Sequence, residues 1–289
     1  MKRFDFSVKK DLLLPSSAGR PFGLDLYTPI GPDSFPLVLF AHGFKGFKDW
    51  GHWHLLASRF ASRGIGFLKF NFSHNGVTPD HPVDFADLEA FGQNNYTKEL
   101  MDLETLVQTL SQRPDWLPAA CDLNRLGLIG HSRGGAISIL FAARESRIKA
   151  VATWAAVSDL GFLWKDPERV ERWRQDGVVY IANARTGQDM PLYFQLYEDF
   201  QLHKKAYEVE TQLRHLKKPM LIVHGSADPG VPVAQAQELK SWNPGAELVV
   251  IEGADHVFGG SHPFEGEELP PFSKVLEEAT SSFFQNHLG

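Results

Sequence analysis

The stretch Leu128-Ile129-Gly130-His131-Ser132-Arg133-Gly134-Gly135 decides how the rest of this chain of 289 residues is interpreted. An apolar run from Leu126 to Ile129 leads into it, and a mostly apolar segment from Ala136 to Ala143 follows. This order predicts a strand, a sharp turn and a buried helix, with the sequence Gly-x-Ser-x-Gly at the turn.

A serine at such a turn stands on a strained backbone, so the residues two positions away on either side must be small. Gly130 and Gly134 meet this requirement. The helix that begins after Ser132 directs backbone N–H groups toward negative charge that develops near the serine. The pattern favours a nucleophilic serine. Because the chain holds 25 glycines, the motif could also arise by chance as an ordinary glycine turn with a surface serine. A catalytic base and acid elsewhere in the sequence would distinguish the two interpretations.

The composition is that of an ordinary globular protein, with 43% apolar and 22% charged residues. A net charge of -6 without any basic run argues against a nucleic-acid partner. We expect no membrane partner, because no apolar stretch approaches about 20 residues. The segment from Met1 to Ser7 has no apolar core and does not read as a signal peptide. We therefore expect a cytoplasmic location, which the single cysteine, Cys121, also suits.

Apolar runs that indicate strands alternate along the chain with helical patterns. This alternation predicts an α/β fold, in which a mostly parallel sheet carries helices on both faces. The segments Phe4–Leu14 and Pro21–Thr28 instead predict an antiparallel hairpin at one edge of the sheet. The further predicted strands are Leu37–Ala41, Gly66–Asn71, Leu126–Ile129, Ala150–Ala156, Pro219–Gly225 and Glu247–Ile251.

The stretch from about Asp159 to Arg214 interrupts this alternation with charged and aromatic residues. Within it, Val178–Ile181 and Pro191–Phe194 predict a hairpin. We therefore expect one domain, residues 1–289, with a small cap-like insertion at about 159–214 that covers the active site. The alternative is an ordinary pair of surface helices and a hairpin.

A serine nucleophile needs a base that takes its proton and a third group that orients the base. Asp228 and His256 each follow a predicted strand, and such loops gather at the carboxyl edge of a parallel sheet. The order Ser132, Asp228, His256 is that of α/β hydrolases. Asp159, which follows the strand after the serine, is the alternative acid, but the sequence around Asp228 fits the pattern better.

Four motifs in this order resemble those of α/β-hydrolase-fold serine hydrolases. The resemblance covers nearly the whole chain and is strongest from Leu37 to His256. Within the fold, the chain is similar to the esterases that resemble dienelactone hydrolase, cinnamoyl esterase and the acylaminoacyl peptidases. The motifs are His42-Gly43-Phe44, Gly130-His131-Ser132-Arg133-Gly134, His224-Gly225-Ser226-Ala227-Asp228 and Gly253-Ala254-Asp255-His256.

The resemblance implies an oxyanion hole made of two backbone N–H groups, those of Arg133 and Phe44. The choice of Phe44 over Gly43 is a judgement, because only Gly43 and Gly46 mark this loop. Ser132 stands where a dienelactone hydrolase carries cysteine and a dehalogenase carries aspartate. The resemblance implies no cofactor.

The other histidines and acids near these motifs are expected to be structural. His42, His131 and His224 lie at strand ends, and Asp255 is adjacent to His256. The segment His52-Trp53-His54 has metal-ligand spacing but no third ligand, so we expect no metal.

These observations lead to the hypothesis of a serine esterase that acts on a small-molecule ester with an apolar or aromatic acyl or alcohol group. A peptidase or a thioesterase would use the same three residues, Ser132, Asp228 and His256. A third hypothesis, a hydrolase fold that binds a ligand without catalysis, fits less well, because such proteins usually lack one of the three.

Overall fold

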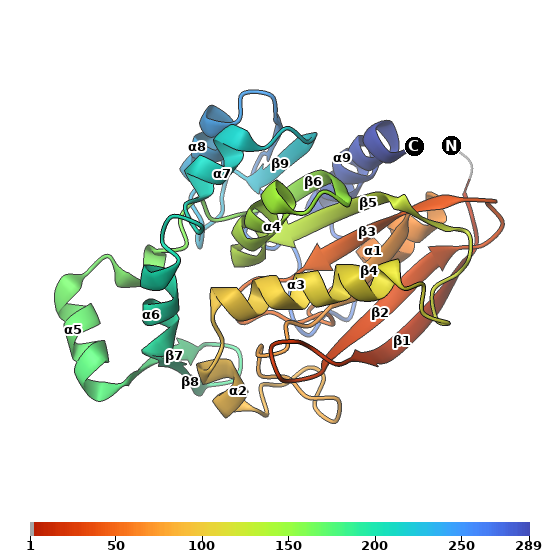
Figure 1. The fold of residues 1–289 in the computed structure, drawn as a ribbon. Helices are drawn as coiled ribbons and strands as arrows, with labels where there is room; N and C mark the ends of the chain where they lie inside the picture. The colour runs from red at the N-terminus through yellow and green to blue at the C-terminus, as the bar shows by residue number, and fades with distance from the viewer. Residues whose placement is uncertain (1–2) are drawn as a thin grey trace.

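The computed structural model describes residues 3–289 (Figure 1), so Met1 and Lys2 of the expected non-signal segment lie outside the described residues. An eight-stranded sheet has the order β1-β2-β4-β3-β5-β6-β9-β10. The β1–β2 and β2–β4 pairs are antiparallel and the other neighbours are parallel, which confirms the predicted fold class. The strands are β1 (Phe6–Leu14), β2 (Phe22–Pro29), β3 (Phe35–Ala41), β4 (Gly66–Phe70), β5 (Cys121–His131), β6 (Ile148–Trp154), β9 (Met220–Gly225) and β10 (Glu247–Ile251).

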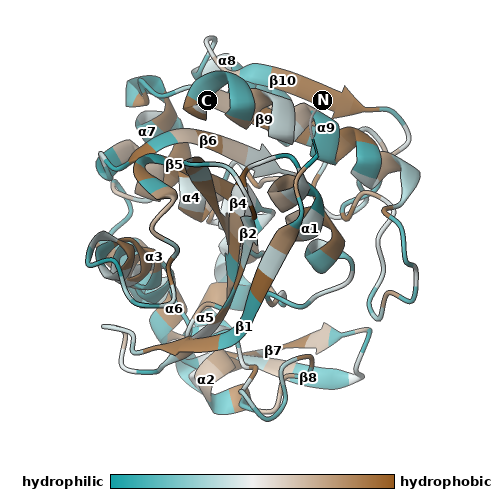
Figure 2. Ribbon diagram, turned by 90° about the vertical axis from the view of Figure 1, so that its right-hand side faces the viewer, coloured by the Kyte–Doolittle hydropathy of each residue, from teal (hydrophilic) through white to brown (hydrophobic). Residues whose placement is uncertain are grey.

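Helices cover both faces of this sheet. Helices α1 (Trp53–Ser62) and α9 (Pro271–Leu288) pack on one face, and α3 (Tyr96–Ser111), α4 (Arg133–Arg144) and α8 (Ala234–Trp242) pack on the other. Figure 2 shows polar and apolar residues alternating along α1 and α9, as expected for helices with one buried side. The central strand β3 is buried along its whole length, which explains its continuous apolar sequence.

Strand β5 and helix α2 are among the elements that differ from the sequence prediction. Strand β5 begins at Cys121, before the apolar run, because polar residues at its start pair with the start of β3. A short helix, α2 (Leu88–Gly92), was not predicted, since it has no apolar periodicity. The Asp87 side chain accepts a hydrogen bond from the Ala90 N–H and so starts this helix as an N-cap.

The predicted insertion contains the predicted hairpin, β7 (Val178–Asn183) and β8 (Gln188–Tyr193). Figure 1 shows this hairpin with α5 and α6 on the side of the molecule opposite α9, toward which the arrowheads of β3 and β5 point. The helical elements of the segment are η1 (Phe162–Trp164), α5 (Pro167–Asp176), α6 (Gln195–Leu202) and α7 (Val209–His215).

The aromatic residues of this segment pack mainly against one another. The Trp164 and Phe200 ring centroids are 4.7 Å apart, and the Phe194 and Tyr197 centroids are 5.3 Å apart. The Trp173 indole N–H donates to the Leu192 carbonyl at 2.8 Å. These rings therefore form a small core that holds the hairpin in place. Among residues 3–289, no helix is both long and apolar enough to cross a membrane.

Candidate active site

The turn after β5 has the strained geometry that its sequence predicts. Ser132 has a φ of 55° and a ψ of -122°, a conformation that non-glycine residues seldom adopt. A Cβ on Gly130 would lie 2.2 Å from the Gly134 carbonyl oxygen, and a Cβ on Gly134 would lie 2.3 Å from that of His42. Both glycines are required because no larger residue fits this turn.

The structure brings Ser132, His256 and Asp228 into one hydrogen-bonded chain. The Ser132 Oγ lies 3.0 Å from His256 Nε2, and His256 Nδ1 lies 2.7 Å from Asp228 Oδ2. With the ring proton on Nδ1, the histidine donates to the carboxylate and its Nε2 is free to accept the serine proton. The arrangement has the geometry of a nucleophile, a base and an orienting acid.

Asp228 is held as a carboxylate by its surroundings. Its side chain is fully buried, and Oδ1 accepts hydrogen bonds from the Gly230 and Val231 N–H groups, each at 2.8 Å. Burial alone would raise the pKa of Asp228, but hydrogen bonds from His224, His256 and Val231 outweigh it and hold that pKa well below its usual range. A permanently ionised Asp228 can stabilise a positively charged His256.

The alternative acid, Asp159, does not join this chain. Its Oδ1 accepts from the Gly161 N–H at 2.7 Å, and its side chain is 52% exposed. Asp255, although adjacent to His256, accepts from the backbone N–H groups of Val257 and Gly259 and so shapes the turn.

His131 and His42 are buried near Ser132 and His256, and each forms a hydrogen bond to the backbone. The His131 Nε2–H donates to the His256 carbonyl at 2.9 Å, which fixes the backbone that carries the His256 ring. His42 Nε2 accepts from the Phe72 N–H at 3.1 Å. Burial lowers the pKa of each ring to about 3, so both stay neutral near pH 7.

The loop after β3 lies against the serine. A Cβ on Gly43 would lie 2.8 Å from the Ser132 Cβ, so the amides that follow are close to the nucleophile. The Arg133 N–H is the first amide of α4 and has no acceptor within the helix. The Arg133 guanidinium lies 4.7 Å from the centroid of the Phe44 ring and is paired with buried Glu99. The side chains of the two predicted oxyanion donors thus contact each other.

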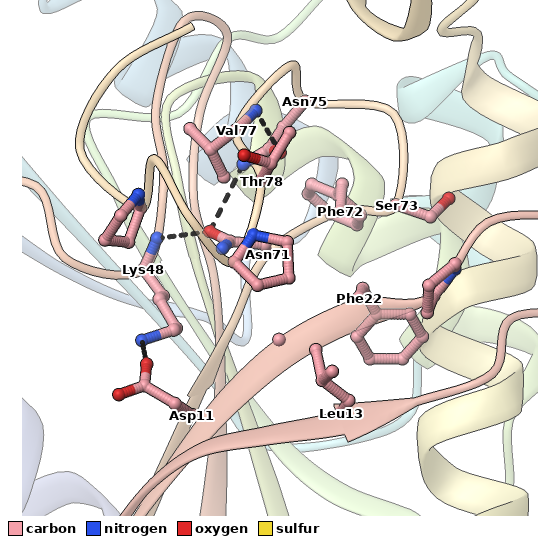
Figure 3. Close-up of a pocket in the computed structure, with 14 residues that line it drawn as sticks. Asp11, Leu13, Phe22, Lys48, Asn71, Phe72, Ser73, Asn75, Val77 and Thr78 are labelled. Carbon is pink, nitrogen blue, oxygen red and sulfur yellow. Dashed lines mark hydrogen bonds and ion pairs between the residues drawn. The ribbon is translucent and has the colours of Figure 1, made fainter. Parts of the chain in front are cut away.

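The far end of this loop is fastened by polar side chains from β2 and from the segment after β4. Figure 3 shows Asn71 accepting from the Lys48 N–H, at 2.7 Å, and from Asn75 at 3.2 Å. Burial alone would raise the pKa of Asp25, but Lys69 and Lys48 beside it hold it at about 2. The cavity drawn in Figure 3 measures about 80 Å³ and is not lined by Ser132. This cavity lies among the polar residues that hold the end of the loop after β3.

A larger cavity of about 300 Å³ opens at Ser132 and His256. Its aromatic wall comes from Phe44, Trp50 and Trp53, which belong to the loop after β3 and the start of α1. The insertion contributes Asn183 and Arg185, at the turn of the β7–β8 hairpin. The aromatic rings of the insertion that form its own small core are not among the residues that line this cavity.

Sequence reasoning missed several of these residues. Trp50, Trp53 and His262 line the cavity, but nothing in their local sequence shows which way they face. Glu99 of α3 is also buried, where it pairs with Arg133. Helix α3 carries three acids, Glu99, Asp102 and Glu104, and nothing in the local sequence distinguishes Glu99 as the partner of Arg133.

The histidines of His52-Trp53-His54 have the spacing of metal ligands in the sequence. The His52 Nε2 is instead within 2.7 Å of the buried Ser273 hydroxyl. Within residues 3–289, no three histidine, cysteine or acidic side chains are grouped as a metal site would require.

The matched family model is described as the alpha/beta hydrolase family and spans residues 38–266, so the chain belongs to this family. Among curated relatives, it is 24% identical over 243 residues to 2,6-dihydropseudooxynicotine hydrolase of Paenarthrobacter nicotinovorans, covering 82% of this chain and 57% of the relative. It is also 24% identical over 240 residues to the uncharacterized peptidase YuxL of Bacillus subtilis (strain 168), covering 78% of this chain and 31% of the relative. The chain therefore spans less than two thirds of the length of either relative.

Among solved structures, Est1E of Butyrivibrio proteoclasticus with bound ferulic acid is similar, with a TM-score of 0.69 and 21% identity. The match covers 96% of this chain and 98% of that one. At this identity the likeness shows the α/β-hydrolase fold, in agreement with the family model. Membership of a hydrolase family supports the prediction that this protein is an enzyme.

Proposed function

We propose that this protein is a serine hydrolase that cleaves carboxylic esters through an acyl-enzyme on Ser132. The observation that carries the proposal is the chain of hydrogen bonds from Asp228 through His256 to the Ser132 hydroxyl, with distances of 2.7 Å and 3.0 Å. The strained turn that presents Ser132 supports the same role.

In the proposed reaction, Ser132 Oγ attacks the ester carbonyl as His256 Nε2 takes its proton. The negative oxygen of the tetrahedral intermediate accepts hydrogen bonds from the Phe44 and Arg133 N–H groups. The alcohol then leaves with the proton that His256 returns, and the acyl group stays on Ser132. Water repeats the sequence, with His256 again as base, and releases the acid.

Asp228 supports both halves of this cycle. Its carboxylate holds the histidine proton on Nδ1 and stabilises the imidazolium that forms at each proton transfer. Since backbone amides also hold the Asp228 pKa low, we expect the carboxylate to remain ionised throughout the reaction.

Substrate preference is proposed from the cavity. Its aromatic wall, with Phe44, Trp50 and Trp53, suits an ester with an apolar or aromatic part. The bound ferulic acid in the similar Est1E structure is an aromatic acid, which agrees with this choice.

The test compares 4-nitrophenyl esters with aminoacyl 4-nitroanilides, each assayed with the wild-type protein and with Ser132→Ala. We expect ester hydrolysis by the wild type, loss of turnover in Ser132→Ala, and an unchanged circular dichroism spectrum. Anilide hydrolysis without ester turnover would instead favour the second candidate, a peptidase, to which the relative named as a peptidase points.

A further inference from the structure

The permanently charged side chains that line the cavity at Ser132 are all positive. Two of the side chains that line it, Lys45 and Arg185, are cationic, and none is a carboxylate. The chain as a whole carries 35 acidic and 29 basic residues, so this sign is opposite to that of the protein. A cavity with cationic walls attracts a substrate with negative charge.

Arg185 stands at the tip of the β7–β8 hairpin. Its Nη2 donates to the Val83 carbonyl at 3.3 Å, and its Cζ lies 5.7 Å from the Phe47 ring centroid. Asp84 approaches Nη1 only to 3.8 Å, beyond hydrogen-bonding distance, and is 62% exposed, so water screens this pair. A guanidinium has five N–H donors, so donors remain for a ligand carboxylate.

Lys45 brings the second cation to the same cavity and follows Phe44 directly in the chain. Its Nζ donates to the Ala182 carbonyl at 3.2 Å and thereby ties the loop after β3 to the hairpin. The two cations therefore belong to segments that are joined to each other, which keeps both charges at the cavity.

Other charged groups nearby do not cancel this pair. Asp228 is fully buried behind His256 and is hydrogen-bonded there, so it does not line the cavity. His262 lines the cavity, and its Nδ1 accepts from the Gly51 N–H at 2.9 Å. Burial lowers the pKa of His262 and the charge of Arg185 lowers it further, whereas Asp84 and Asp49 oppose this shift without reversing it.

We propose that the substrate of this site is an anionic ester, one that carries a carboxylate beside its apolar or aromatic part, and that Arg185 is the specificity-determining residue that binds the carboxylate. This inference rests on the proposed ester hydrolysis by Ser132. The bidentate fork of arginine matches a carboxylate, and the aromatic wall accommodates the remainder of the molecule.

The experiment uses two pairs of esters, because the carboxylate could belong to the acyl or to the alcohol part. The acyl pair is 4-nitrophenyl hydrogen adipate and its methyl ester, and the alcohol pair is 4-acetoxybenzoate and its methyl ester. For each pair, the measured quantity is the ratio of kcat/KM for the charged ester to that for the neutral ester, after subtraction of spontaneous hydrolysis.

We expect the wild type to favour the charged member of at least one pair about tenfold, and Arg185→Gln to bring that ratio close to one. The matched control is Arg172→Gln, which removes the same charge from an exposed position on α5 and should keep the wild-type ratio. Arg185→Lys should keep part of the preference, and added salt should reduce the wild-type ratio.

The inference on the carboxylate is overturned if the wild type cleaves the esters without preferring either charged member, or if the preference survives in Arg185→Gln. If no ester is cleaved faster by the wild type than by Ser132→Ala, the proposed function fails first and this inference fails with it. The two failures are therefore distinguishable.

Discussion

The serine turn and the tip of the β7–β8 hairpin both line the cavity at Ser132, but their packing differs sharply. At the turn, a Cβ on Gly130, Gly134 or Gly135 would lie within 2.4 Å of a neighbouring heavy atom. At the hairpin tip, a Cβ on Gly187 would meet nothing within 4 Å. The proposed chemistry is thus built on a segment whose sequence is dictated by contacts, and the proposed selectivity is built on a segment that tolerates change.

The largest expected effect is on kcat, when Asp228 is replaced. Asp228→Asn should lower kcat about ten-thousand-fold, because an amide no longer enforces the histidine tautomer or stabilises its cation. Ester turnover under saturating substrate measures it. Asp159→Asn is the matched control at the edge of the insertion, and we expect its kcat to stay within about threefold of the wild type. A larger loss in Asp159→Asn than in Asp228→Asn would reverse the assignment.

The next largest effect is on the free energy of unfolding, when one glycine of the serine turn and one of the hairpin tip are each replaced by alanine. Gly134→Ala should lower the free energy of unfolding by about 3 kcal/mol, since the new Cβ would press on the carbonyls of Ala41 and His42. Gly187→Ala should cost about 1 kcal/mol, because only its φ of 69° opposes a side chain. Urea unfolding measures both values. Equal losses would show that the hairpin tip is as constrained as the turn.

The third prediction concerns pH. Burial first, and then the charge of His256, lowers the pKa of His131 from 6.5 to about 3 in the folded protein. Between these values the unfolded chain binds a proton that the folded chain does not, so stability is full above pH 6.5 and falls as the pH falls. His131→Gln should remove about 1.4 kcal/mol per pH unit from this slope between pH 6 and pH 4. Urea unfolding at several pH values measures it, and parallel slopes would contradict the prediction.

The smallest effect concerns the side chain of Phe44. Phe44→Ala removes its contacts with the Arg133 guanidinium and with the Phe91 ring, and should lower kcat about tenfold by loosening the oxyanion loop. The backbone N–H itself remains, so Phe44→Tyr should restore kcat. Steady-state kinetics separates an effect on the oxyanion loop from an effect on substrate binding. A change in KM alone would assign Phe44 to the pocket and not to the oxyanion hole.

The sequence predicted best those parts of the molecule that depend on local constraints. The strained turn at Ser132 needs small neighbours, and Asp228 and His256 follow strands of a parallel sheet, so short motifs were enough to place them. The fold class and the insertion hairpin followed from alternation of apolar runs and turn residues.

The walls of the cavity could not be predicted in the same way. The aromatic residues of the insertion were expected above the serine, but Trp164 and Phe200 pack within the insertion, and the cavity takes its rings from Trp50 and Trp53. Which way a ring faces depends on how separate segments dock, and that information is not local. The burial of Glu99 is another tertiary effect, because its partner Arg133 lies 34 residues away.

Labelling the protein with a fluorophosphonate and locating the adduct by peptide mass spectrometry tests most directly whether Ser132 is an activated nucleophile. Such a reagent phosphonylates a serine that a neighbouring base activates. We expect one adduct, on the peptide that contains Ser132, and none in Ser132→Ala. An adduct on another residue, or labelling that survives in Ser132→Ala, would contradict it.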